Sequence, residues 1–210
     1  MAGDYLRRTA ITRPILTDKQ KHLLDDTISE WKAACNIGSR IGWNHGETWK
    51  TYLQDLAYGE VLEETRLKSQ HAILATHQAA GALSGVEEIE ELDENYETSR
   101  PNFTANTVKY DTRTMTLFDD GTVSLTTVDD RIRCELALPD DEGGYQNQYL
   151  KAEDWEVTES TLSRRDGDYY LHLGFRKTKP EKLVEAQGDD EDRTVLGVDL
   201  GIVNIATTST

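Results

Sequence analysis

Apolar residues recur at helical spacing in the first half of the chain. A short basic segment from Tyr5 to Leu16 reads as a strand, and Thr17 to Gln20 then carries a capping-box pattern that predicts the start of a helix. Further helices are predicted over about 47–64 and 69–84. In the helix predicted over about 47–64, the side chains expected to face inward are Trp49, Leu53, Leu56 and Leu62. We expect a loop over 38–46 and an acidic loop or exposed helix end over 85–100.

After Pro101 the pattern changes from helical to alternating. Strands are predicted over 114–118 and 122–128 around an Asp-Gly turn, then over 131–138. A second hairpin joins 155–163 to 169–177, and in its return strand Tyr170, His172 and Arg176 share one face. Short strands at ~8–12-residue spacing are typical of a small barrel or sandwich. The two halves together predict an α+β fold.

The end of the chain is an apolar run over 193–210, which predicts one strand buried on both faces. It carries a single acidic residue, Asp199, between Gly197 and Gly201. A carboxylate in such a strand is unfavourable unless it is paired or holds a metal ion. The alternative is a strand-end aspartate that caps a turn.

The segment from Gly197 to Ala206 resembles the first catalytic motif of the RuvC-type nuclease domain in the TnpB family, transposon-encoded RNA-guided DNA endonucleases. The segments 108–113, 123–128 and 167–172 resemble, in the same order, strands that precede that motif in halophile members of the family. The opening of the third helix, Leu67 to His71, is a weaker match. The resemblance covers most of the chain and depends on the order and spacing of these segments together.

This resemblance implies a domain plan. Residues 1–16 and 101–180 correspond to a small oligonucleotide-binding-like β-barrel, the wedge domain, and residues 17–100 to a helical recognition insertion. Residues 181–192 form an acidic linker. Residues 193–210 then correspond to the first strand of an RNase H-like (RuvC) nuclease domain.

The resemblance also implies site residues. Asp199 is the expected catalytic and metal-binding carboxylate, one of the set that holds two Mg²⁺ ions. Arg7, Arg8 and Arg13 are candidates for contacts to a nucleic-acid backbone, and the alternative is solubilising charge on an edge strand. Ser69 and Gln70 open a helix that reads a short DNA motif in the family. The alternative for them is an N-cap and an ordinary helix residue.

Composition adds a complication, because the net charge is −16 and nucleic-acid binders usually present a basic surface. Either the chain does not bind nucleic acid, or it works in a high-salt cytosol where screening weakens charge repulsion. The Asp/Glu-rich, lysine-poor composition favours the second explanation. With no signal-peptide pattern and no membrane-length apolar run, we expect a cytoplasmic protein. The two cysteines and five histidines show no metal-ligand spacing.

The later acidic residues and the four-cysteine zinc module of the family have no counterpart in these 210 residues. We therefore expect the N-terminal portion of a family member with an incomplete nuclease site and no activity alone. Its expected partners are guide RNA and target DNA, with no membrane and no small-molecule substrate. Two alternatives remain open: a stand-alone nucleic-acid-binding regulator derived from the family, and an unrelated acidic α+β domain.

Overall fold

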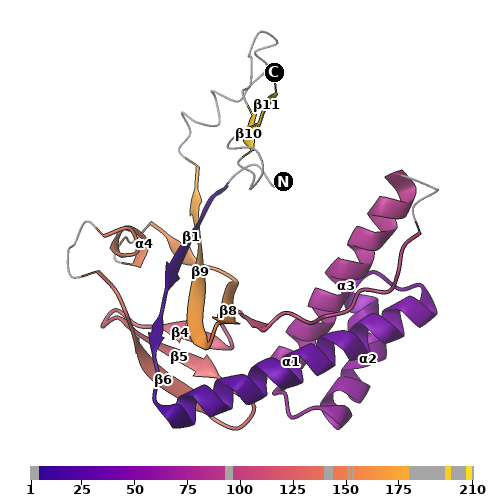
Figure 1. The fold of residues 1–210 in the computed structure, drawn as a ribbon, viewed down its shortest axis with the longest axis horizontal. Helices are drawn as coiled ribbons and strands as arrows, with labels where there is room; N and C mark the ends of the chain where they lie inside the picture. Colours follow the sequence, from indigo (N-terminus) through magenta and orange to yellow (C-terminus); the bar gives the residue numbers. More distant parts are fainter. Residues whose placement is uncertain are drawn as a thin grey trace. The chain divides into compact units, whose positions relative to one another are not determined.

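The computed structural model describes residues 5–92, 97–139, 144–150, 152, 154–179, 197–199 and 207–209 (Figure 1). Antiparallel sheets and four helices make up this part of the chain, which confirms the predicted α+β class. The chain divides into two compact units, Arg7–Lys177 and a second unit of Met1–Leu6 with Thr178–Thr210. The predicted linker over 181–192 lies outside the described residues.

Three helices form the first layer of the larger unit. They are α1 (Asp18–His45), α2 (Lys50–Glu64) and α3 (Ser69–Leu92). The predicted capping box is present at the start of α1. The Gln20 amide donates to Thr17 Oγ1 at 3.4 Å, and the Thr17 amide donates to Gln20 Oε1 at 2.9 Å. These two bonds satisfy donors that a helix N-terminus otherwise leaves free.

The predicted loop over 38–46 is wrong, because α1 continues to His45 and ends only at Gly46 with a left-handed φ of 62°. The glycines in this segment serve close packing between helices. A Cβ at Gly38 would lie 3.0 Å from Ala79 Cβ, and one at Gly42 would lie 2.4 Å from Leu83 Cδ1. Helix α3 continues to Leu92, beyond the predicted end at residue 84. Of the two alternatives for 85–100, the exposed helix end is therefore right for residues 85–92.

The predicted inward face of α2 is only partly right. Leu53 is fully buried, together with Ala57 and Val61 one and two turns later. Trp49 is 73% exposed, and Leu56 and Leu62 are also exposed. The buried stripe of α2 is therefore narrower than the apolar pattern indicates.

Two antiparallel sheets form the rest of the larger unit. Sheet A has the strand order β1-β9-β8-β3, with β7 also on β9, and sheet B has the order β2-β6-β5-β4. The strands are β1 (Tyr5–Thr12), β2 (Pro14–Ile15), β3 (Thr107–Tyr110), β4 (Met115–Leu117), β5 (Thr122–Thr126), β6 (Arg131–Leu136), β7 (Glu156–Val157), β8 (Ser160–Arg165) and β9 (Asp168–Thr178). A short helix, α4 (Asn147–Leu150), follows β6. Both predicted hairpins, β4–β5 and β8–β9, are present.

The opening segment of the chain joins both sheets. β1 lies beside β9 in sheet A, and β2 pairs with β6 in sheet B, so strands before the helices pair with strands after them. The chain changes sheets four times: at Arg13, between β2 and β3 through the helices, between β3 and β4, and between β6 and β7. Within the described residues the strand order does not close into a barrel.

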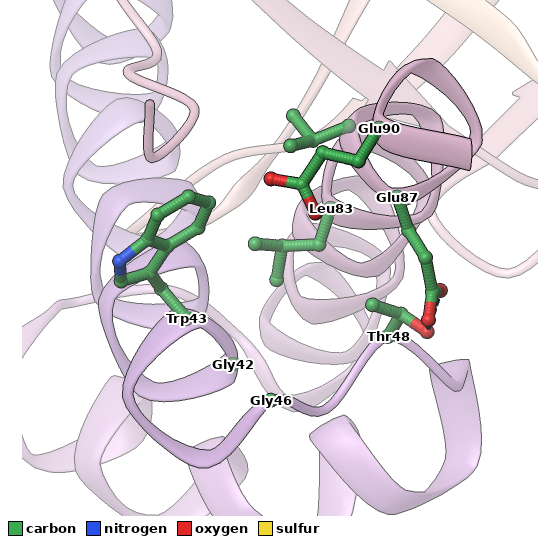
Figure 2. Close-up of a pocket in the computed structure, with 8 residues that line it drawn as sticks. Gly42, Trp43, Gly46, Thr48, Leu83, Glu87 and Glu90 are labelled. Carbon is green, nitrogen blue, oxygen red and sulfur yellow. Dashed lines mark hydrogen bonds between the residues drawn. The ribbon is translucent and has the colours of Figure 1, made fainter. Parts of the chain in front are cut away.

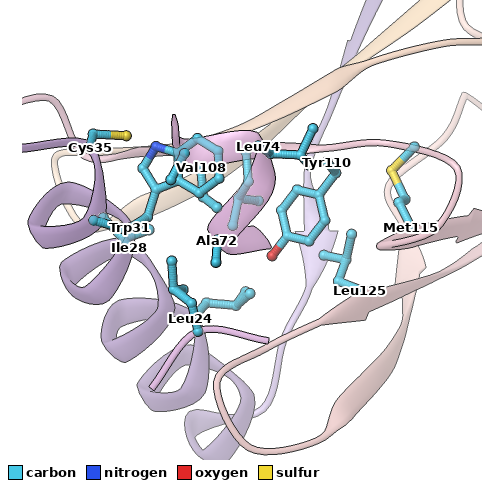
Figure 3. Close-up of a cluster of buried hydrophobic side chains, with 14 of the residues drawn as sticks. Leu24, Ile28, Trp31, Cys35, Ala72, Leu74, Val108, Tyr110, Met115 and Leu125 are labelled. Carbon is cyan, nitrogen blue, oxygen red and sulfur yellow. The ribbon is translucent and has the colours of Figure 1, made fainter. Parts of the chain in front are cut away.

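One hydrophobic core connects the sheets and the helices (Figure 3). Leu24 and Trp31 of α1 and Leu74 of α3 pack near Val108 and Tyr110 of β3 (Figure 3). Sheet A contributes Tyr169, Leu171, Leu173 and Phe175 of β9, and sheet B contributes Val123, Leu125, Ile132, Cys134 and Leu136. Cys35 and Cys134 are both buried and unpaired. Burial raises the pKa of both thiols, that of Cys134 to about 11, so neither is a reactive thiolate.

The predicted single strand over 193–210 is also wrong. The described part of this segment forms two short strands, β10 (Gly197–Asp199) and β11 (Thr207–Ser209), paired antiparallel with Asp199 opposite Thr207. The two strands form their own small sheet. The remainder of the segment lies outside the described residues.

Candidate nucleic-acid interface

Polar and basic side chains share one surface of sheet A, which we call the outer face. The register places Thr161 opposite both His172 and Lys109, and it places Ser163 opposite Tyr170. Directly opposed residues in an antiparallel pair point to the same side, whereas the alternate residues along these strands fill the core. The outer face comprises Arg7, Arg13, Thr107, Lys109, Glu156, Thr161, Ser163, Arg165, Asp168, Tyr170, His172 and Arg176.

Two of the three arginines predicted from the sequence belong to the outer face. Arg13 Nη2 lies 2.5 Å from Asp168 Oδ1, and its guanidinium stands 5.4 Å from the centre of the Tyr170 ring. Because Ala10 and Thr12 point into the core, the alternation of β1 puts Arg7 on the same side as Arg13. Arg8 points to the other side, and its guanidinium donates to the Arg7 carbonyl at 2.8 Å.

The ion pairs on the outer face are exposed. Lys109 Nζ lies 2.6 Å from Glu159 Oε1, and Arg176 Nε lies 2.8 Å from Glu156 Oε2. Exposed pairs of this kind contribute only about 0–1 kcal/mol, so a phosphate can replace either carboxylate at little cost. Arg165 and Arg7 form no ion pair with any residue that the structure describes. These two cations are therefore the most available for an anionic ligand.

Two uncharged rings, those of His172 and Tyr170, lie in the middle of the outer face. His172 Nε2 and Ser163 Oγ are 3.0 Å apart, within hydrogen-bond distance. Partial burial, together with the nearby Arg165 guanidinium, lowers the pKa of His172, so its ring is neutral at pH 7. The Tyr170 ring is half-buried beside it. A neutral imidazole and a phenol ring supply hydrogen-bonding and stacking surface between the flanking cations.

Ser69 and Gln70 lie elsewhere, at the start of α3, and the Gln70 amide is engaged within the protein. Its Nε2 donates to Asp111 Oδ2 at 2.7 Å, and its Oε1 accepts from Arg113 Nη1 at 3.2 Å. Ser69 is exposed. A base edge that paired with Gln70 would have to displace both hydrogen bonds.

Asp111 is the centre of this network. Its Oδ1 accepts from the backbone amides of Arg113 at 3.0 Å and Thr114 at 2.9 Å. Partial burial alone would raise the pKa of Asp111, but hydrogen bonds from Thr114, Arg113 and Gln70 outweigh it and lower the pKa below its usual value. The ionised carboxylate thereby links the first turn of α3 to the β3–β4 turn.

The predicted metal site at Asp199 lies in β10, where only the backbone is described. In the described part of the chain, no group of three or more His, Cys, Asp or Glu residues is arranged to hold a metal ion. None of the described helices combines the length and the apolar character that a membrane span requires.

Alternation along the sequence places Tyr170, His172 and Arg176 on one face, but it does not reveal Lys109 and Arg165 or their alignment with Arg7 and Arg13. Alternation within each strand tells which side chains of that strand share a face. Which strands lie side by side, and therefore which cations come together, cannot be read from alternation. No protein-family model matches the chain, and no curated protein sequence matches it significantly.

Proposed function

We propose that this chain binds nucleic acid through the outer face of sheet A, as the RNA- and DNA-binding portion of a TnpB-like, RNA-guided DNA endonuclease. The observation that carries the proposal is a group of five cations, Arg7, Arg13, Lys109, Arg165 and Arg176, on one sheet face of a chain whose net charge is −16. Such a local group of cations gives even an acidic protein an attraction for phosphate at that face.

The proposal treats the two sheets as an open, oligonucleotide-binding-like wedge domain. Such domains present a sheet face to single-stranded nucleic acid, with cations along the backbone path and flat side chains between them. Arg7 and Arg165 take phosphates, and Tyr170 stacks on a base. Helices α1 to α3, which lie between β2 and β3 in sequence, take the place of the recognition insertion. Guide pairing then reads the target sequence.

In the same proposal Asp199 supplies one carboxylate of a two-Mg²⁺ site that cleaves the target DNA. Two divalent ions in such a site activate the attacking water and stabilise the leaving oxygen. The resemblance assigns the other carboxylates, and a zinc module, to later motifs of the family. Asp199 has no role in nucleic-acid binding under this proposal.

A stand-alone nucleic-acid-binding regulator without cleavage activity is the second candidate. The observation that favours it is that every residue of the outer face lies within the single compact unit Arg7–Lys177. Binding by this face requires nothing from the segment that contains Asp199.

Fluorescence anisotropy with labelled single-stranded RNA and DNA tests the shared part of both candidates, at a KCl concentration where the protein is folded. We expect Arg165→Gln to weaken binding roughly threefold, the cost of one exposed charge contact. Arg40→Gln is the matched control, because Arg40 pairs with Glu60 in the helical layer and should bind like the wild type. Equal affinity for all three proteins would reject the outer face as the interface.

Asp199→Ala separates the two candidates when it is introduced into a protein that also carries the later motifs of the family and is measured with Mg²⁺ and a guide-paired target. An endonuclease that contains the complete set of motifs should lose cleavage through this substitution and keep its RNA affinity. A regulator should show no cleavage in either form. Loss of RNA binding in Asp199→Ala would contradict the role given to Asp199.

A further inference from the structure

A pocket of about 260 Å³ lies between the C-terminal end of α1 and the last turns of α3 (Figure 2). Its lining residues are Gly42, Trp43, Gly46, Thr48, Leu83, Val86, Glu87 and Glu90. None of them belongs to the outer face of sheet A, so the pocket is separate from the proposed nucleic-acid interface. Its volume is slightly below the range for drug-sized ligands and suits a small group.

Three independent features give this pocket a preference for cations. Glu87 and Glu90 line one side, and the lining residues that the structure describes include no lysine, arginine or histidine. The C-terminal end of α1, at Gly46, forms another side and carries the negative pole of the helix dipole. The Trp43 indole, 40% exposed, offers the electron-rich face that attracts ammonium groups.

The carboxylates have hydroxyl partners but no positive partner in the described structure. Glu87 Oε2 accepts from Thr48 Oγ1 at 2.9 Å, and Glu90 Oε1 accepts from the Thr98 hydroxyl. Glu90 has no cation beside it among the described lining residues, whereas Glu87 also lines a neighbouring cavity with Lys50. Figure 2 shows the Glu90 carboxylate above Leu83 and the Trp43 ring to one side of them, and all three side chains line the same pocket.

The apolar part of the lining determines what kind of cation fits. Leu83 and Val86 line the pocket next to Trp43. A bare or hydrated metal ion gains nothing from these side chains, whereas the methylene stem of an organic amine buries apolar surface against them.

We propose that this pocket binds a primary alkylammonium group. The ammonium is neutralised by Glu90 and Glu87, its positive charge faces the Trp43 ring, and its methylene stem contacts Leu83 and Val86. Two sources supply such a group: a free aliphatic polyamine, or a lysine side chain of another protein.

Isothermal titration calorimetry with 1,5-diaminopentane tests this proposal on the whole chain, at a KCl concentration that keeps it folded. We expect saturable binding of the diamine. The affinity should fall about fivefold in Trp43→Leu, because this substitution removes one cation–π contact. Glu90→Gln should weaken it at least as much. Glu88→Gln is the matched control, because Glu88 is exposed and does not line the pocket, and it should bind like the wild type.

Two further ligands identify the chemistry and its source. Pentanol carries the stem without the charge and should show no saturable binding. Nα-acetyl-lysine methylamide presents a lysine side chain on a blocked backbone. Tighter binding of this compound than of the diamine assigns the pocket to a lysine of a partner, and the reverse order assigns it to a free polyamine. The proposal is overturned if neither amine binds, if pentanol binds as well, or if Glu88→Gln weakens binding as much as Glu90→Gln.

Discussion

Neither ring nitrogen of His71 has a hydrogen-bond partner among the described residues, although this side chain is fully buried where α1, α3 and β3 meet. The rings of Trp31 and Tyr110 contact it edge-on, with centroids at 6.1 and 5.0 Å. Burial lowers the pKa of His71 to about 4. The Asp111 carboxylate opposes this shift, and the Arg131 guanidinium adds to it. The imidazole is therefore held neutral in the core at pH 7.

This histidine should make the fold acid-sensitive. The unfolded chain takes up a proton near pH 6.5 and the native state only near pH 4, so stability from His71 is complete above about pH 6.5 and is lost as pH falls toward 4. We expect a loss of roughly 3 kcal/mol from this group over that interval. Urea unfolding of wild type and His71→Phe at pH 7 and pH 4.5 measures it.

The phenylalanine variant removes the titrating group and keeps an aromatic ring, so its stability should fall less between the two pH values. His22→Gln changes an exposed histidine and should follow the wild type. An equal pH dependence in wild type and His71→Phe would show that His71 is not the group responsible.

Close packing of α1 on α3 depends on Gly42. A Cβ at this position would meet Leu83 Cδ1 at 2.4 Å and the Glu47 carbonyl oxygen at 2.8 Å. We expect Gly42→Ala to destabilise the protein by about 1–3 kcal/mol through overpacking. Gly81→Ala is the matched control, because nothing lies within 4 Å of its Cβ position on α3. Gly81→Ala should stabilise the protein by about 0.5–1 kcal/mol. The midpoint of urea unfolding measures the change in stability for both variants. A neutral Gly42→Ala would refute the packing argument.

The glycines of α1 explain why the loop predicted over 38–46 is wrong. Thr17 and Gln20 mark the start of α1 through local chemistry that is readable in four residues. Gly38 and Gly42 are also readable, but their local meaning favours a loop, and only the approach of α3 explains why a helix keeps them. Tertiary packing outweighs local propensity at this contact.

Strands were more predictable than their arrangement. Alternation in 169–177 predicted which side chains of β9 enter the core, because a period of two assigns each residue to a side. It did not predict that β9 lies between β1 and β8, and therefore that Arg13 and Arg165 flank Asp168. Nor did it predict the contact of Gln70 with Asp111, which are 41 positions apart. The candidate site depends on strand order, and no local pattern encodes that order.

At the scale of the whole molecule, the charge of −16 should make folding dependent on salt. Like charges repel in dilute buffer, whereas at molar salt the screening length falls to about 3 Å. We expect far-ultraviolet circular dichroism to show partial structure without salt and complete structure in molar KCl. Sucrose is the control, because it also favours compact states but does not screen charge. Full structure in dilute buffer would refute the high-salt interpretation.

In the proposed function, the outer face of sheet A is the part of this acidic chain that binds nucleic acid. The salt dependence of RNA binding is the most direct test of this proposal. The measurement is the slope of log K against log [KCl] for single-stranded RNA, with wild type and the double variant Arg7→Gln/Arg165→Gln. If these two arginines contact phosphates, the magnitude of the slope should fall by roughly one to two in the double variant. An unchanged slope, or no RNA binding by the folded wild type at any salt concentration, would contradict the account.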